Sequence, residues 1–439
     1  MYKKIFFLFV CLAAFTSTFA QKANIQSAIN YLKDNDIANA KKMIDEACAN
    51  EATKTNAKAW LVKAVVYQAI GTSKDMMPML QFILNEKPYM LDLANANTLA
   101  SSTPNALGEA VEAYKKSISF DSKYEKEEVA PLLTSILFVT YNNGINKMND
   151  NKFADAYTVF GQVGELAQID NGNLWKGNAS LDSIFASSKM YQANCAYNTN
   201  KDDEAIGLIE ECIKNPITQT PDMYIMLNEL YGKKSNDAKW TETMAAARAK
   251  FPNDKRILNN EINYYLDKGR AEESINKLKE GIALEPQKAD LYLLLGQTYL
   301  GMANPTDKSG KPIARPANAK ELEQNAITNY TKAAELDPKN AYAPFNMGLI
   351  HFNNAKGIND EMNKTVDNKK YESLKPQRDG LIGQALPLFV KAKGLIEVEK
   401  INDSNRTMYR ELLTGMMNCY NILNQAEKAD EIKKLIDKK

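Results

Sequence analysis

Histidine is almost absent from this sequence, since His351 is the only one among 439 residues. Metal sites and acid–base mechanisms near neutral pH depend heavily on imidazole side chains, and one histidine supports few of them. The glycine patterns of nucleotide-binding loops and the G-x-S-x-G and H-E-x-x-H patterns of hydrolases are missing as well. The sequence therefore predicts a protein that is not an enzyme and that has no catalytic residues, metal site or cofactor.

Cysteine is also scarce, and none of the five cysteines lies in the C-x-x-C spacing of zinc or redox sites. An excess of charge of one sign is lacking too, because the 55 basic and 54 acidic side chains nearly cancel. A balanced surface offers no electrostatic footprint for nucleic acid or for anionic lipid. We therefore expect no nucleic-acid partner.

Long apolar runs are confined to the N-terminus, where residues 5–15 are apolar and follow Lys3 and Lys4. This run is too short to cross roughly 30 Å of hydrocarbon as a helix. A segment of small residues comes next and ends at Ala20. The layout predicts a signal peptide over residues 1–20 that is cleaved after Ala20, with an uncleaved N-terminal anchor as the alternative.

Cleavage would leave a mature chain with a formal charge of −1, because two lysines are removed, and without a transmembrane segment. Cys11 follows Phe9 and Val10, which does not match the Leu-x-small-Cys pattern of bacterial lipoprotein signals. We expect an exported protein that is periplasmic, with the cell surface and the medium as alternative locations.

A repeated pattern occupies the rest of the chain. Its clearest copy has Tyr292, the pair Leu295-Gly296 and Tyr299 on one helical stretch. A second stretch follows with Ala326, Tyr330 and Ala333, and it ends near Pro338. Pro252 and Pro286 end the two preceding copies and lie one period of 34 residues apart.

This pattern resembles the tetratricopeptide repeat (TPR), in which two helices form a hairpin and successive hairpins stack. The resemblance implies an all-α fold, a right-handed α-solenoid of about nine TPR-like helical hairpins over residues 21–438. Three insertions interrupt the pattern, at about residues 71–105, 302–320 and 356–378. Each falls between the first and second helix of its own hairpin, so we expect all three along the same edge.

Close packing within the hairpins is expected where small residues of the two helices face each other, as for Gly144 with Ala156 and Gly296 with Ala326. Cys195 and Cys212 lie on the two helices of one hairpin, about 10 Å out of register at 1.5 Å per residue. A disulfide requires Cα atoms within about 7 Å. We therefore expect buried thiols at these positions.

Partner binding is expected on the concave face, because proteins that resemble this chain line that face with first-helix residues. Asn259 and Asn263 match part of the Lys/Asn clamp that some TPR domains use for peptide carboxylates, but the lysines are missing. The row is apolar, which suits an apolar helix or extended segment of a partner; packing between neighbouring hairpins is the alternative explanation. The predicted groove residues are Phe138, Tyr141, Ile145, Met190, Tyr197, Ile225, Asn259, Asn263, Leu293, Phe345, Leu349 and Phe352.

The sequence alone leaves three possible functions for this protein. The favoured one is a non-enzymatic scaffold of the cell envelope that binds segments of partner proteins in the groove. The alternative is a glycan-binding or nutrient-binding component of an outer-membrane uptake system. An enzyme comes third, and it would depend on His351.

Overall fold

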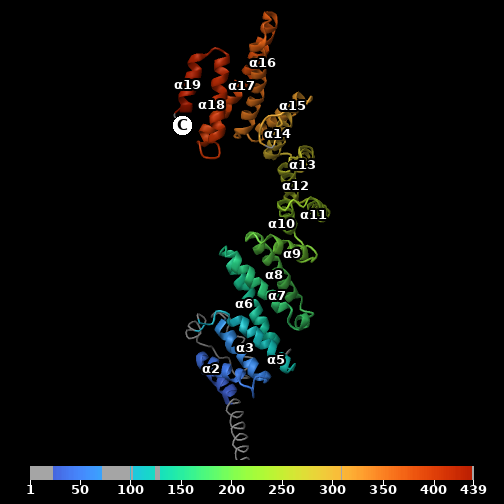
Figure 1. Ribbon diagram of the computed structural model, residues 1–439, viewed down its shortest axis with the longest axis vertical. Coiled ribbons are helices and arrows are strands. Elements are labelled where there is room, and N and C mark those ends of the chain that lie inside the picture. The colour runs from blue at the N-terminus through green and yellow to red at the C-terminus, as the bar shows by residue number, and fades with distance from the viewer. Residues whose placement is uncertain (1–22, 72–98, 100–101, 124–128, 308, 438–439) are drawn as a thin grey trace, which may run out of the picture. The chain divides into compact units, whose positions relative to one another are not determined.

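The computed structural model describes residues 23–71, 99, 102–123, 129–307 and 309–437 (Figure 1). The predicted signal peptide and most of the first insertion lie outside these residues. The chain divides by its internal contacts into two compact units, residues 1–243 and 244–439. Within the described residues, regular structure is helical apart from one isolated bridge between Thr306 and Pro312.

The helices follow one another in pairs, as the repeat predicts. The first unit begins with helical residues 23–33. It continues with α2 (Ile37–Ala49), α3 (Ala57–Gly71), α5 (Ala106–Phe120), α6 (Ala130–Asn149), α7 (Phe153–Ala167), the 3-10 helix η3 (Ile169–Trp175), α8 (Ala179–Asn198), α9 (Asp202–Cys212), α10 (Pro221–Lys233) and the first half of α11 (Asp237–Lys250).

The second unit contains the second half of α11 and the remaining eight helices. These are α12 (Lys255–Asp267), α13 (Ala271–Leu284), α14 (Ala289–Ala303), α15 (Ala319–Leu336), α16 (Tyr342–Lys364), α17 (Asn368–Glu399), α18 (Arg406–Ile422) and α19 (Ala426–Asp437). Counting residues 23–33 as the first helix, the described part of the chain holds nine successive pairs. The prediction of an all-α repeat fold is confirmed.

Tight turns close the hairpins that carry no insertion. Each has one residue in the left-handed backbone region between its two helices, at Asn35, Asn151, Asn200, Ser235, Gly269 or Asn424. The left-handed conformation ends a helix abruptly and is least costly for glycine and asparagine. The chain can therefore reverse within a few residues and bring the second helix back along the first.

Glycines on the first helices let an aromatic ring of the second helix come close. A Cβ atom built on Gly144 would lie 2.6 Å from the Phe160 ring, and one on Gly348 would lie 2.8 Å from the Phe389 ring. We expected alanines opposite these glycines, and the structure corrects that detail. The ring four residues beyond the alanine, one helical turn later, is the nearest group.

Gly296 on α14 provides a test of this contact. A Cβ atom there would lie 2.7 Å from the ring of Tyr330, which is fully buried. We expect Gly296→Ala to destabilise the chain by about 1–3 kcal/mol, as overpacked cores do. The matched control is Gly301→Ala on the same helix, where an added Cβ meets nothing within 4 Å. The free energy of unfolding of this control, measured in urea, should rise by up to about 1 kcal/mol, because alanine favours helix over glycine. An equal rise in both variants would contradict the contact between Gly296 and Tyr330.

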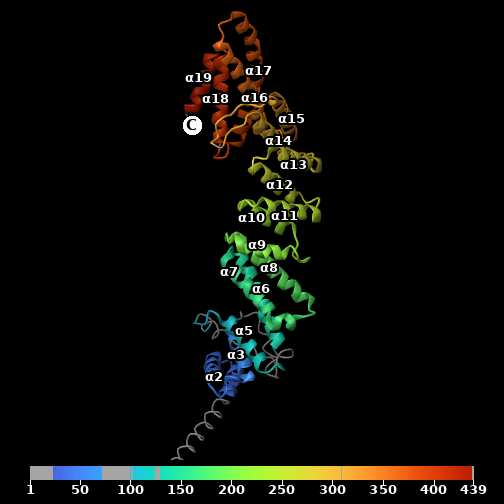
Figure 2. The ribbon, with the colours of Figure 1, turned by 45° about the vertical axis from the view of Figure 1, so that its right-hand side comes forward.

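The described insertions take two different forms. Residues 304–307 and 309–318, between α14 and α15, are largely irregular. The third insertion, at about 356–378, consists mainly of helix, because α16 runs on to Lys364 and α17 begins at Asn368. The two helices lie side by side in Figures 1 and 2, and Arg378 donates to the side-chain oxygen of Asn359 across the pair at 3.0 Å.

Candidate protein-interaction surface

The first unit joins several of the predicted groove residues into one row on its first helices. Phe138 and Tyr141 lie on α6, and Phe138 is 38% exposed despite its size. The Tyr141 ring lies 6.2 Å from that of Phe160 on α7 and 6.3 Å from that of Tyr191 on α8, measured between centroids. Ile145 is half-buried one turn after Tyr141. One part of this row thus packs inside the hairpins and another faces solvent.

The row continues across α8 to α10. Met190 and Tyr197 on α8 and Ile225 on α10 are half-buried. The Tyr197 hydroxyl donates a hydrogen bond to the carboxylate of Glu229 on α10. Burial, together with this carboxylate, raises the pKa of Tyr197 to about 12, so the hydroxyl remains a donor at neutral pH. Apolar surface and a fixed polar group therefore occur side by side here.

The second unit holds the other predicted groove residues. Asn263 is exposed on α12, while Asn259 on α12 and Leu293 on α14 are half-buried. On α16, Phe345 is buried and Phe352 half-buried, and both rings contact Phe389 of α17 with centroids 6.3 Å away. Leu349, also half-buried, packs against the same core cluster. These α16 side chains support their own hairpin, and their part in a groove stays a prediction.

His351 is half-buried on α16 and faces a small polar cluster. Glu323 on α15 is buried and accepts hydrogen bonds from Arg315 of the second insertion and from Asn354 on α16, the latter at 2.9 Å. Burial lowers the pKa of His351 below its ordinary value of 6.5, and the Glu323 carboxylate only partly opposes this. The histidine is therefore a half-buried helix residue whose lowered pKa favours the neutral form at pH 7.

Replacement of His351 should flatten the pH dependence of stability near pH 6. Since its pKa is lower in the folded chain than in the unfolded chain, the unfolded chain binds more protons as the pH falls through 6.5. Stability should be full above pH 6.5 and decrease below it. We expect His351→Gln to remove this decrease in thermal unfolding at pH 5 and pH 7.5. The single histidine resonance in an NMR titration should give a pKa below 6.5, and a value above 6.5 would contradict the assignment.

The four cysteines in the described part of the chain are free and buried, as expected for Cys195 and Cys212. Burial raises the pKa of each of those two thiols to about 11. At neutral pH both are protonated and weakly nucleophilic. Among the described residues, no cluster of three or more metal-ligating side chains is formed, and no helix is long and apolar enough to span a membrane.

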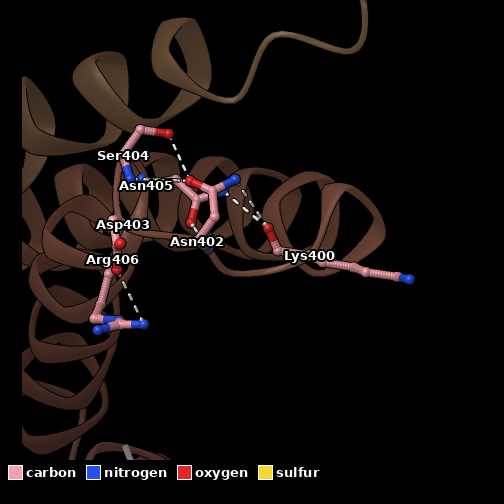
Figure 3. Close-up of polar contacts among 6 residues, drawn as sticks. All are labelled: Lys400, Asn402, Asp403, Ser404, Asn405 and Arg406. Carbon is pink, nitrogen blue, oxygen red and sulfur yellow. Dashed lines mark hydrogen bonds and ion pairs between the residues drawn. The ribbon is translucent and has the colours of Figure 1, made fainter.

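The last hairpin carries a feature that sequence reasoning missed. A cavity of about 640 Å³ lies between Arg406 and Arg410 on α18, Leu435 on α19 and the loop residue Ile401. Figure 3 shows how this loop is held: Asn405 donates to the carbonyl of Lys400 at 3.1 Å and accepts from the backbone N–H of Asn402 at 2.9 Å. The side-chain oxygen of Asn402 in turn accepts from the N–H of Ser404 at 3.0 Å and fixes the entry to α18.

These stacked hairpins, with glycines against rings and left-handed turns, define the class of helical repeat proteins. A family model described as TPR repeat matches residues 263–302, from the end of α12 through α14. No curated protein matches the chain. The chain therefore contains a TPR repeat at these residues.

Solved structures that resemble the chain are also of TPR proteins. The C-terminal part of a TPR repeat-containing protein from Cytophaga hutchinsonii is 17% identical, covering 67% of this chain and 93% of that one, with a TM-score of 0.46. A TPR repeats protein from Bacteroides fragilis is 18% identical over 68% and 97%, with a TM-score of 0.26. YrrB, described as a TPR protein with an unusual peptide-binding site, is 16% identical over 52% and 94%, with a TM-score of 0.32.

Proposed function

We propose that this protein is a non-enzymatic scaffold of the cell envelope that binds segments of partner proteins. The observation that carries the proposal is the row on α6, α8 and α10 of the first unit. There Phe138 exposes a large apolar ring beside half-buried apolar side chains, and the Tyr197–Glu229 pair adds a polar contact. Apolar anchors beside fixed polar groups are the usual composition of protein-binding surfaces.

The envelope location is proposed from the N-terminal sequence. A basic start, an apolar run over residues 5–15 and small residues up to Ala20 form the pattern of an export signal. A scaffold at this location would meet its partners in the periplasm. The partners are proteins, since charge gives no attraction to nucleic acid.

Site-specific crosslinking in intact cells tests the proposal. A photoreactive phenylalanine at position 138 should crosslink one or more envelope proteins reproducibly. The matched control is the same residue at position 120, at the end of α5, because Phe120 is also exposed, at 43% against 38%, but is not on a first helix. Tyr197→Ala should reduce the crosslinked product at least about tenfold, as loss of an interface anchor does. Equal crosslinking at both positions would contradict a binding row.

The tryptophans weigh against the glycan-binding alternative. Sugar rings stack on free aromatic faces, yet Trp175 and Trp240 are buried. Trp60, the third, is half-buried and has the ammonium group of Lys116 4.1 Å from its ring centroid and that of Lys63 5.8 Å away. Two of the three indoles are therefore buried and the third already carries a lysine, so protein binding is the better-supported function.

A further inference from the structure

Four aliphatic side chains line the cavity of about 640 Å³ in the last hairpin. Leu413 of α18 is buried. Ile401, Leu435 and Ile436 are half-buried and pack against the core of the second unit. A hollow of this size lies within the range of roughly 300–1,000 Å³ that proteins use for small organic ligands. An apolar ligand would remove these side chains from water, which is favourable.

The charged side chains that line this cavity are all positive. Arg406 and Arg410 lie four residues apart on α18 and therefore share one face of the helix. Arg406 pairs with Asp403 at 3.3 Å (Figure 3), and the Asp403 side chain is 96% exposed. Arg410 is exposed and has no ion pair among the described residues. Two guanidinium groups and one carboxylate leave one positive charge in excess, which a ligand with a single negative charge would balance.

The polar side chains of the lining are mainly hydrogen-bond donors. A guanidinium group has five N–H donors and no acceptor. The Tyr409 hydroxyl, also in the lining, already donates to Glu397 at 2.6 Å. Glu397 is itself paired with Lys393 at 2.8 Å, so it adds no net charge. Among the lining side chains, only the hydroxyl oxygens of Thr407 and Tyr409 can accept.

A lining of donors and aliphatic groups selects the kind of ligand. An ionised carboxylate only accepts hydrogen bonds, and it forms paired bonds with a guanidinium group. A peptide backbone brings as many donors as acceptors, and the lining side chains offer few acceptors for them. The loop before α18 is also held in place, because buried Asn405 donates to the carbonyl of Lys400 and accepts from the N–H of Asn402 (Figure 3). A preformed wall loses little conformational freedom when a small ligand binds.

We propose that this cavity binds a small organic anion in which one carboxylate is joined to an apolar chain, as in a medium-chain carboxylic acid. The carboxylate accepts hydrogen bonds from Arg410 and Arg406, and the apolar chain covers Ile401, Leu435 and Ile436. The site lies in the second unit. It is additional to the binding row on α6, α8 and α10 and does not depend on it.

The test titrates the full-length protein with four probes by calorimetry, below the concentrations at which they form micelles. Decanoate should bind to one site. Decanol and decylammonium have the same chain without the negative charge, and they should bind at least about tenfold more weakly, since hydrogen bonds to charged groups are lost. Acetate should also bind at least about tenfold more weakly, because it lacks the methylene groups that would be buried. Equal affinity for decanoate and decanol, or for decanoate and acetate, would overturn the proposal.

The decisive variant is Arg410→Met, which keeps the apolar stem, deletes the charge and should weaken decanoate binding at least about tenfold. Its matched control is Lys434→Met on α19, an exposed cation of the same hairpin that does not line the cavity. Both variants should unfold at the temperature of the unmodified protein, because both side chains are exposed. Arg410→Glu should reverse the preference, so that decylammonium binds more tightly than decanoate. Equal loss of decanoate binding in Arg410→Met and Lys434→Met would refute the site.

Two further results would identify other occupants, and either would overturn the assignment. If inorganic phosphate displaces decanoate at the same concentration as decanoate itself, the cavity binds simple anions. If a peptide that alternates leucine with glutamate binds more tightly than decanoate and is lost in Arg410→Met, the cavity receives a segment of a partner protein.

Discussion

Truncation of Phe389 to alanine should destabilise the second unit by about 3–5 kcal/mol, as loss of a large buried aromatic side chain does. The side chain is fully buried on α17. Its ring contacts Phe345 and Phe352 of α16. It also lies against Gly348 of α16 and Gly415 of α18, where built Cβ atoms would come within 2.8 and 3.1 Å of it. One ring therefore joins three helices, and its removal leaves a cavity that none of them can close alone.

Val390→Ala is the matched control, because Val390 is the next residue on α17 and is 50% exposed. Its effect should stay within about 0.5 kcal/mol. Repeat proteins lose structure locally, so hydrogen exchange by mass spectrometry is the most direct measurement. Phe389→Ala should accelerate exchange in α16, α17 and α18 by roughly a hundredfold or more, since 1.4 kcal/mol corresponds to tenfold. Unchanged exchange there would show that the ring does not hold the helices together.

The hairpins could be predicted from the sequence because their signals are local. The 34-residue spacing of Pro252 and Pro286 gives the period, and the second helix begins shortly after Asn151 or Asn200, residues that tolerate a left-handed turn. The third insertion was harder to interpret. It is too charged to show an apolar stripe, yet it extends α16 and α17, with Met362 buried between the polar residues Glu361 and Asn363.

The exposed fraction of each side chain at the candidate surface could not be predicted from the sequence, because it depends on contacts between residues that lie far apart in the chain. Tyr141 and Phe345 hold equivalent places on their first helices, but Tyr141 is half-buried and Phe345 is buried. Both contact an aromatic ring of the second helix, Phe160 at 6.2 Å and Phe389 at 6.3 Å between centroids, so this contact does not account for the difference. Phe389 lies 44 residues after Phe345, beyond the third insertion. Two cavities beside α7, of about 690 and 440 Å³, were missed for the same reason, because helices from three hairpins form them.

These contacts determine which substitutions can report on partner binding. A variant at Phe345 or Phe352 removes contacts with Phe389, so it would weaken the hairpin and any groove together. Phe138 is a better probe, because its side chain is partly exposed. Binding changes at that position can be separated from changes in folding.

Removal of both cations around Glu261 should cost about 3–5 kcal/mol, because a buried carboxylate would be left unpaired. The Glu261 side chain on α12 is only 7% exposed. Lys277 of α13 lies 3.1 Å from one of its oxygens, and Arg248 at the end of α11 lies 3.7 Å from the other. Arg248 also pairs with Glu280, whose side chain is 35% exposed and is therefore solvated in its absence. The double variant Arg248→Met with Lys277→Met keeps the apolar stems and deletes only the charges.

Adding Glu261→Met to that double variant separates charge from packing. If the cost arises from the unpaired carboxylate, the triple variant should recover to within about 1–2 kcal/mol of the unmodified protein, since apolar residues of similar volume replace buried ion pairs well. If the cost arises from lost contacts of the long side chains, the triple variant should be the least stable of the three. Urea unfolding of the three proteins distinguishes these outcomes, and a double variant within about 1 kcal/mol of the unmodified protein would mean that water reaches Glu261.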